Sequence, residues 1–464
     1  MNPSGSSARE QSIVVEEKNV SIRIERSQIK GRYKFVKPSS NESKEVLCGH
    51  EWQERYKKEH ENALRSKKST KKFLIYFCPG DYLGCCGYGN RLRAVVSLFY
   101  LSILTNRIFL IDWRTPEPIS NYLHPHQIQW NHTVRGLEMR GHYWGSAGAE
   151  MRRMAGWDIK GTNGSSFAKW FKNTNFFNYF NKPVEVITTI WYFADEGIKS
   201  NRYLMKRARS LGITPLITNV PDLSVIGCAF SFLFTKSVTL ENYLLRWKKH
   251  FSKKLPTIGI HIRTGDHQFD DRKPLNNRIK NYTDMFQCAL KVEKEVYRID
   301  KRFSNHSQWF LATDNNIVKK YAIKNFPFRT IITTNFTPFH LDVRNYSLSW
   351  CNNTIHEDGI ARCNYTTIAN CESSECLSKF YVNRTFDSNW TTPFNLSSKF
   401  AQGILGMLVD SFLLSQCDYL ILCDSSFSST AVGLSMRTMN TYTLGDQGCV
   451  IRRTGKKQKL RYYG

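Results

Sequence analysis

The stretch Ile258-Gly-Ile-His261-Ile-Arg263-Thr-Gly265-Asp266 decides how this chain is expected to fold. Its first part belongs to an apolar run, 257–262, which is typical of a buried strand. An arginine, a glycine and a carboxylate follow directly, so they lie on the loop beyond the strand. In an open parallel sheet, ligands bind at the carboxyl ends of the strands. The stretch therefore predicts a parallel α/β sheet with a binding loop at Arg263.

Strands and helices alternate along the chain on both sides of this stretch. Downstream, the periodicity predicts helices over 283–298, 315–326, 401–415 and 429–439 and strands over 309–312, 330–333 and 419–422. Upstream, it predicts a strand over 73–78, a loop with four glycines, a core helix that includes 95–104, and a strand over 107–111. Alternating strands and helices are typical of doubly wound parallel sheets.

The 464 residues exceed what one hydrophobic core usually supports, so we expect two domains. A flexible polar stem is expected over 1–72, Rossmann-like domains over 73–250 and 251–445, and a basic tail over 446–464. The second domain is interrupted by an insertion over 338–399 that is rich in cysteine and in glycosylation sequons. The aromatic-rich part of the first domain matches no motif.

The insertion indicates the compartment. Four of its cysteines are close in sequence, and we favour disulfides over a zinc site because the stretch has no Cys-x-x-Cys pair and only one nearby histidine, His356. These are Cys351, Cys363, Cys371 and Cys376. Seven asparagines in this region head Asn-x-Ser/Thr triplets: Asn335, Asn345, Asn352, Asn364, Asn383, Asn389 and Asn395. Such density predicts a disulfide-bonded glycoprotein of the secretory pathway.

The polar segment 1–72 holds no apolar run long enough for a signal peptide or a membrane span. The sequence therefore leaves the route into the secretory pathway open. We expect contact with a membrane only through an anchor that is not present in this sequence.

The formal net charge is +27, from 66 Lys and Arg against 39 Asp and Glu. A field of this sign attracts nucleotide phosphates, acidic glycans, nucleic acid or anionic membranes. Binding to nucleic acid rests on charge alone, including the basic patch 452–461, and sequons in a lumenal loop argue against it. We therefore expect no nucleic-acid partner.

Arg263 has the properties needed to bind a diphosphate. A nucleotide diphosphate that leaves a sugar gains negative charge on its β-phosphate, and a guanidinium offers paired donors that are always protonated. The adjacent Gly265 lets the backbone approach a phosphate closely. The structural alternative is an Arg–Asp pair that only ends the strand.

The motif His261-x-Arg263-x-Gly265-Asp266 resembles the first signature of the α1,2-, α1,6- and protein O-fucosyltransferase superfamily. Leu311-Ala-Thr-Asp314-Asn and the stretch from Val409 to Phe427 are similar to later motifs, the latter closest to the α1,6 enzymes. Gly87-Tyr-Gly89-Asn90-Arg91 is a fourth match. The resemblance implies the GT-B fold, two Rossmann-like doubly wound domains that face a cleft. It also implies inverting, metal-independent transfer of L-fucose from GDP-fucose to a glycan or glycoprotein acceptor in the Golgi lumen.

The same resemblance assigns roles to residues. Arg263 would bind the β-phosphate and stabilise departing GDP, His261 would hold the nucleotide, and Asp410 would contact guanine or its ribose. Ser425 and Ser426 would donate hydrogen bonds to phosphate at a helix N-terminus. The full expected donor site is His261, Arg263, Gly265, Asp314, Asp410, Ser425, Ser426, Phe427, Gly89, Asn90 and Arg91. The structural alternatives are a solvated carboxylate at Asp410 and an ordinary helix cap at the two serines.

The general base is the least defined role. An inverting transfer needs a base near the acceptor hydroxyl, or a hydroxyl that attacks a cation-like fucosyl centre unaided. Asp271 is the candidate, since its offset from His261 matches a carboxylate of the α1,6 enzymes, which have Glu there and lack the neighbouring Asp270. Asp266 is the alternative. No Asp-x-Asp pair occurs in the chain, so we expect cationic side chains rather than a metal ion to bind the diphosphate.

A second class of function is a catalytically inactive glycan- or polyanion-binding protein on the same fold. Release of GDP from GDP-fucose distinguishes the two, because a pure binding protein releases none.

Overall fold

The structure is a computed structural model that describes 16–17, 20–21, 47–66, 71–78, 85–114, 117–134, 136–145, 156–218, 223–264, 282–297, 307–336, 396–436, 440–445 and 448–451. The chain divides into two units, Met1–Lys44 and Glu45–Gly464. In the first unit, β1 (Glu16–Glu17) and β2 (Val20–Ser21) pair antiparallel. Everything below concerns the second unit.

A six-stranded sheet forms the C-terminal half of this unit, with strand order β12-β11-β10-β13-β14-β15. Its strands are β10 (Thr257–Ile262), β11 (Gln308–Thr313), β12 (Thr330–Ile332), β13 (Tyr419–Leu422), β14 (Thr441–Gly445) and β15 (Gly448–Ile451). All neighbours are parallel except β14 and β15. The strand order reverses between β10 and β13, and such a reversal is where open α/β sheets bind ligands.

Four helices accompany this sheet: α12 (Tyr282–Val296), α13 (Asn316–Asn325), α16 (Lys399–Gln416) and α17 (Ser426–Ser435). The predicted elements are confirmed, and only the last helix is clearly displaced. It begins earlier than the expected 429 because the Ser425 hydroxyl oxygen caps it, accepting the Phe427 N–H at 3.2 Å. It ends early because Met436 adopts a left-handed backbone with φ of 54°.

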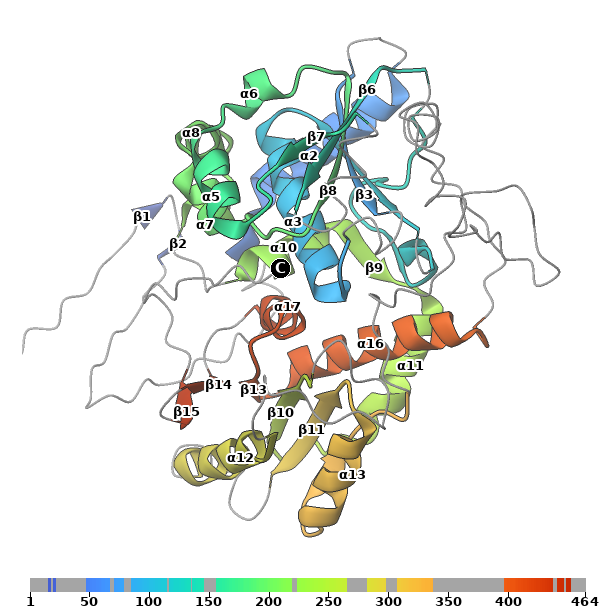
Figure 1. The fold of residues 1–464 in the computed structure, drawn as a ribbon, viewed down its shortest axis with the longest axis vertical. Helices are drawn as coiled ribbons and strands as arrows, with labels where there is room; N and C mark the ends of the chain where they lie inside the picture. The colour runs from blue at the N-terminus through green and yellow to red at the C-terminus, as the bar shows by residue number, and fades with distance from the viewer. Residues whose placement is uncertain are drawn as a thin grey trace, which may run out of the picture. The chain divides into compact units, whose positions relative to one another are not determined.

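A five-stranded parallel sheet forms the N-terminal half, with strand order β4-β3-β8-β6-β7. Its strands are β3 (Phe73–Cys78), β4 (Ile108–Trp113), β6 (Met139–Trp144), β7 (Asp158–Lys160) and β8 (Val184–Thr189). The predicted strand, glycine loop, helix and strand are confirmed, with the buried helix α3 (Tyr88–Leu104) between β3 and β4. The two sheets, parallel apart from the pair β14–β15, confirm the expected α/β, GT-B fold class (Figure 1).

The aromatic-rich region that matched no motif contributes β6, β7 and β8 to this sheet and also forms several helices. It contains α5 (Gly164–Asn173), α6 (Phe176–Tyr179), α7 (Glu196–Ser200), α8 (Arg202–Leu211), α9 (Thr214–Ile217), α10 (Ser224–Leu233) and α11 (Val238–Lys248). It also contains the short helix η2 (Ile119–Asn121) and an antiparallel pair, β5 (Leu123–Pro125) and β9 (Phe234–Lys236). Helix α17 packs against both α3 and α10, so elements of the two halves meet there.

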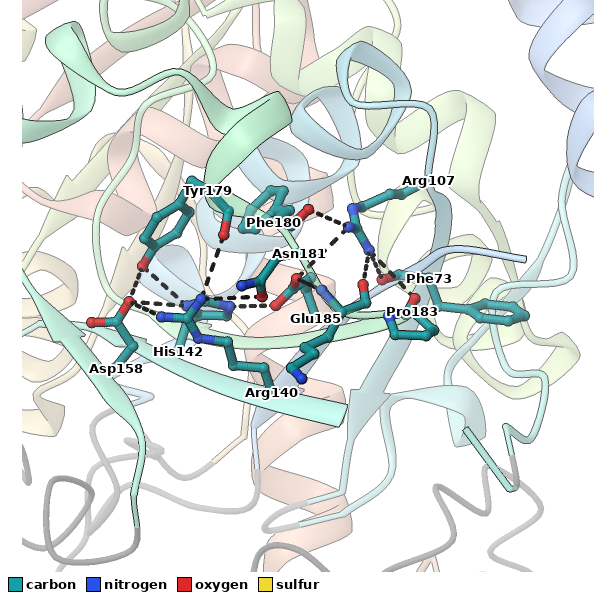
Figure 2. A network of polar contacts seen from close by, with 11 residues as sticks. Phe73, Arg107, Arg140, His142, Asp158, Tyr179, Phe180, Asn181, Pro183 and Glu185 are labelled. Atoms are coloured by element: carbon teal, nitrogen blue, oxygen red, sulfur yellow. Dashed lines mark hydrogen bonds and ion pairs between the residues drawn. The ribbon is translucent and has the colours of Figure 1, made fainter. Parts of the chain in front are cut away.

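A buried ionic network joins the strands of the N-terminal sheet near their amino ends (Figure 2). Arg107 pairs with Glu185 at 3.7 Å, and the Glu185 carboxylate lies 2.6 Å from His142 Nε2. Tyr179 lies 3.0 Å from His142 Nδ1 and donates to Asp158 at 2.7 Å. Because each buried polar group has a partner, the network connects the strands at this end of the sheet.

The expectation of a flexible stem over 1–72 is wrong for residues 47–66. They contain helix α2 (His50–Arg65), whose Trp52, Tyr56 and His60 are buried, and Cys48 forms a disulfide with Cys228. These three residues are spaced four apart and are surrounded in sequence by charged residues. The helical periodicity is therefore weak in the sequence. The expectation of a basic tail over 446–464 is likewise wrong for 448–451, because β15 joins the sheet and Cys449 is bonded to Cys288. The boundary between 73–250 and 251–445 stays a prediction.

A third disulfide joins Cys78 and Cys85 at the end of β3. The cysteine quartet and the six sequon asparagines of the insertion lie outside the described residues; the seventh sequon asparagine, Asn335, precedes the insertion and is exposed. None of the helices in the described part of the chain combines the length and apolar character needed to span a bilayer.

Candidate functional site

A cavity of about 740 Å³, its open mouth included, lies at the carboxyl ends of β10 and β11. Its walls come from those strand ends, from the first turns of α3 and α17, and from α13 and α16. The cavity therefore occupies the position that the strand order favours for a ligand.

One group of residues in the cavity wall is suited to an anion. Arg263 is the first residue after β10 and lines the cavity, as do Gly89 in the first turn of α3 and Ser426 and Phe427 in the first turn of α17. Two helix N-termini thus bring N–H groups and positive dipole ends to the same cavity as a guanidinium.

Gly89 allows the two helices to meet. A Cβ atom at this position would lie 2.5 Å from the Phe427 nitrogen and 2.7 Å from the Ser426 carbonyl oxygen. Both are backbone atoms, so neither can rotate away. The absence of a side chain at Gly89 is therefore what brings both helix N-termini to the cavity.

Asp314 orients the loop that carries Arg263. The Thr264 backbone N–H donates to Asp314 Oδ1 at 2.8 Å, and the Thr264 hydroxyl donates to the same oxygen at 3.0 Å. The carboxylate follows β11 and therefore ties the end of this strand to the end of its neighbour. This contact fixes the backbone next to the guanidinium.

His261 is a buried neutral group in the cavity wall. Its Nδ1 lies 2.7 Å from the Ser428 hydroxyl, and its ring lies 4.7 Å from that of Phe427. Burial, with a smaller contribution from the charge of Arg263, lowers the pKa of His261 to about 3. The imidazole is therefore uncharged at neutral pH and can take part in hydrogen bonds without adding charge.

The cavity wall also holds a carboxylate and an ammonium. Burial raises the pKa of Asp410, on α16, to about 6, although the charge of Lys319 and a hydrogen bond from the Thr334 hydroxyl at 2.8 Å act in the opposite direction. Burial lowers the pKa of Lys319, on α13. Phe336, Met407 and two glycines of α16, Gly403 and Gly406, also line the cavity.

The structure brings together seven of the residues expected from the sequence: Gly89, His261, Arg263, Asp314, Asp410, Ser426 and Phe427. Asn90, Arg91 and Ser425 do not line the cavity. The buried Arg91 donates from Nε to the Cys86 carbonyl at 2.6 Å and lies over the Trp113 ring, while Ser425 is the helix cap described above. Gly265, Asp266 and Asp271 lie outside the described residues, so the base stays a prediction.

Lys319 and Phe336 were missed by the reasoning from sequence. A signal for Lys319 was present, since it shares one face of its helix with the buried Val318 and Ala322. Among the described residues, no three His, Cys, Asp or Glu side chains are grouped as metal ligands would be.

The sequence matches no protein-family model and no curated protein. The fold resembles the structure of an Arabidopsis thaliana FUT1 mutant in complex with GDP, with 13% identity, coverage of 86% of this chain and 80% of that chain, and a TM-score of 0.51. Fucosyltransferase NodZ from Bradyrhizobium, at 12% identity over 83% of this chain and 100% of its own, has a TM-score of 0.40. POFUT1 in complex with GDP-fucose, at 9% identity over 79% and 95%, has a TM-score of 0.36. The first of these likenesses shows a shared fold.

Proposed function

We propose that this chain is a glycosyltransferase that moves L-fucose from GDP-fucose to a glycan or glycoprotein acceptor, with inversion and without a metal ion. One observation carries the proposal: Arg263, the N-termini of two helices and Asp410 all line one cavity. The arginine and the helix N-termini suit a diphosphate, and Asp410 offers acceptors to a base or a ribose. The FUT1 structure that shares this fold is itself a GDP complex.

In the proposed reaction, the acceptor oxygen attacks the anomeric carbon of fucose from the face opposite to GDP. The bond between that carbon and the β-phosphate oxygen breaks, and its electron pair remains on GDP. Arg263, the Ser426 hydroxyl and the N–H groups at the two helix N-termini stabilise this charge. The acceptor proton passes to a carboxylate, for which Asp271 is our candidate and Asp266 the alternative.

The proposed absence of a metal rests on these donors. A guanidinium and backbone N–H groups in the wall of the cavity can bind a diphosphate without a metal ion. The proposed location is the lumen of the secretory pathway, with the Golgi as the expected compartment. It is supported by the disulfides Cys48–Cys228, Cys78–Cys85 and Cys288–Cys449, since such bonds persist in oxidising compartments.

The proposal is tested by incubating the full chain with labelled GDP-fucose on a glycan array, with GDP-mannose as the control donor. We expect label on a subset of glycans, GDP release that depends on the acceptor, and an unchanged rate in EDTA. If the chain binds GDP-fucose but releases no GDP with any glycan, the inactive binding protein is favoured. A loss in EDTA that a divalent ion restores would contradict the metal-free mechanism.

The raised pKa of Asp410 also predicts how the affinity for GDP depends on pH. Its carboxylate accepts hydrogen bonds, and with a pKa of about 6 it is ionised above that pH and protonated below it. GDP affinity should therefore be constant above about pH 7 and should fall as the pH decreases through 6, approaching tenfold per unit. Calorimetric titration from pH 5 to 8 measures this dependence. Asp410→Asn is the control, because it should bind weakly and retain only the slope due to the phosphate itself; equal slopes would refute the assignment.

A further inference from the structure

Lys319 differs from the other residues of the cavity because it is a lysine removed from water. The residue is 9% exposed, and it lies on the face of α13 that also buries Val318 and Ala322. Lysine is almost never buried unless it is paired. The charge of Asp410 favours its protonated form, in opposition to burial. The cavity wall thus holds both an acceptor, Asp410, and a cationic donor, Lys319.

One residue fixes both groups. The Thr334 carbonyl accepts from Lys319 Nζ at 2.8 Å, and the Thr334 hydroxyl donates to Asp410 Oδ1 at 2.8 Å. The Phe336 carbonyl accepts from Lys319 Nζ at 3.1 Å. An ammonium has three N–H donors, and two are used by these carbonyls. The third is left for a ligand in the cavity that Lys319 lines.

We propose that Lys319 determines nucleobase specificity, as the donor of a donor–acceptor pair with Asp410 that recognises the Watson–Crick edge of guanine. This inference rests on the proposed function and deepens it. Guanine offers an acceptor, O6, beside two donors, the N1–H and the 2-amino group. The Lys319 ammonium suits the first and the Asp410 carboxylate suits the other two.

Other bases fit this pair less well. Adenine presents the reverse pattern, a 6-amino donor beside the N1 acceptor, so it would place donor against donor and acceptor against acceptor. Uracil offers only one N–H to the carboxylate. A buried site rejects a ligand that leaves its polar groups unpaired far more strongly than one that only loses apolar contact. The pair therefore selects guanine over the other common bases.

The inference is tested by measuring the affinities of GDP, 6-thio-GDP, IDP and ADP for the full chain and for Lys319→Met. Sulfur is a weak acceptor, so 6-thio-GDP reports on the contact to O6, and IDP lacks the 2-amino group that faces Asp410. We expect the parent to bind 6-thio-GDP about tenfold more weakly than GDP and ADP at least 100-fold more weakly. Lys319→Met should bind GDP roughly 10- to 100-fold more weakly, lose its preference for GDP over 6-thio-GDP, and keep its preference for GDP over IDP.

The matched control is Lys320→Met, which removes the same charge from an exposed position one residue away and should leave all four affinities unchanged. Equal weakening of GDP and 6-thio-GDP by Lys319→Met would overturn the inference, because a lysine that only holds the chain at 334–336 predicts that result. If Lys319→Met does not fold, the inference is tested on the parent protein alone. Equal affinities of the parent for GDP and 6-thio-GDP would also overturn the inference. No binding of GDP by the parent would instead overturn the proposed function, and this inference with it.

Discussion

Replacing Arg263 with alanine is expected to lower kcat for transfer from GDP-fucose about 100- to 1,000-fold, the usual cost of removing a donor that stabilises developing charge. The β-phosphate carries more charge in the transition state than in bound GDP-fucose, so kcat should fall more than KM rises. Steady-state kinetics over a range of donor concentrations separate the two parameters.

Arg263→Lys should recover only part of this loss, because an ammonium keeps the charge but cannot offer the paired donors of a guanidinium. Arg246→Ala, at an exposed position near the end of α11, is the control for the loss of one positive charge and should retain the parent kcat. A kcat for Arg263→Ala within a factor of two of the parent would rule out the role given to this residue.

Replacing Gly89 with alanine is expected to abolish most of the stabilisation that GDP confers on the protein. The added methyl group would meet the backbone of Ser426 and Phe427, so the N-termini of α3 and α17 must move apart. The anion site that they share would then open, and we expect GDP affinity to fall at least tenfold. The unliganded protein should also lose about 1–3 kcal/mol, as is usual for overpacking. Thermal unfolding with and without GDP measures both effects.

Gly433→Ala is the matched control for crowding on α17. Its Cβ would lie 2.6 Å from the Ile226 Cβ, on the face of the helix that meets α10 rather than the cavity. It should lower the unfolding temperature of the unliganded protein but leave the shift caused by GDP intact. If the two variants respond to GDP equally, the close approach of the two helices is not what forms the anion site.

The sheet and the residues expected to bind phosphate could be predicted from the sequence because their signals are local. The run that forms β10 is apolar and ends at Arg263, and β11 likewise ends next to Asp314. Strand ends of one parallel sheet converge on the same edge, so residues found separately along the chain could be expected to meet. The motifs also predicted that Gly89 and Ser426, at the N-termini of α3 and α17, belong to this site.

Around the expected base site only Asp410 was predicted from the sequence, because its partners lie on elements that only the fold brings together. Lys319 is on α13, Asp410 on α16, and Thr334 connects them from the segment after β12. No spacing in the sequence relates these three positions. For Arg91 the motif predicted a contact with the ligand that the structure does not show. Its guanidinium instead donates a hydrogen bond to the Cys86 carbonyl, just before α3.

The most direct test of the account is chemical rescue of Arg263→Ala in single-turnover transfer from GDP-fucose. We predict that added guanidinium accelerates the variant with saturation and leaves the parent unaffected, whereas the same concentration of sodium chloride has no effect on the variant. A parent and variant that transfer fucose at the same rate, neither responding to guanidinium, would contradict the claim that Arg263 stabilises the departing diphosphate.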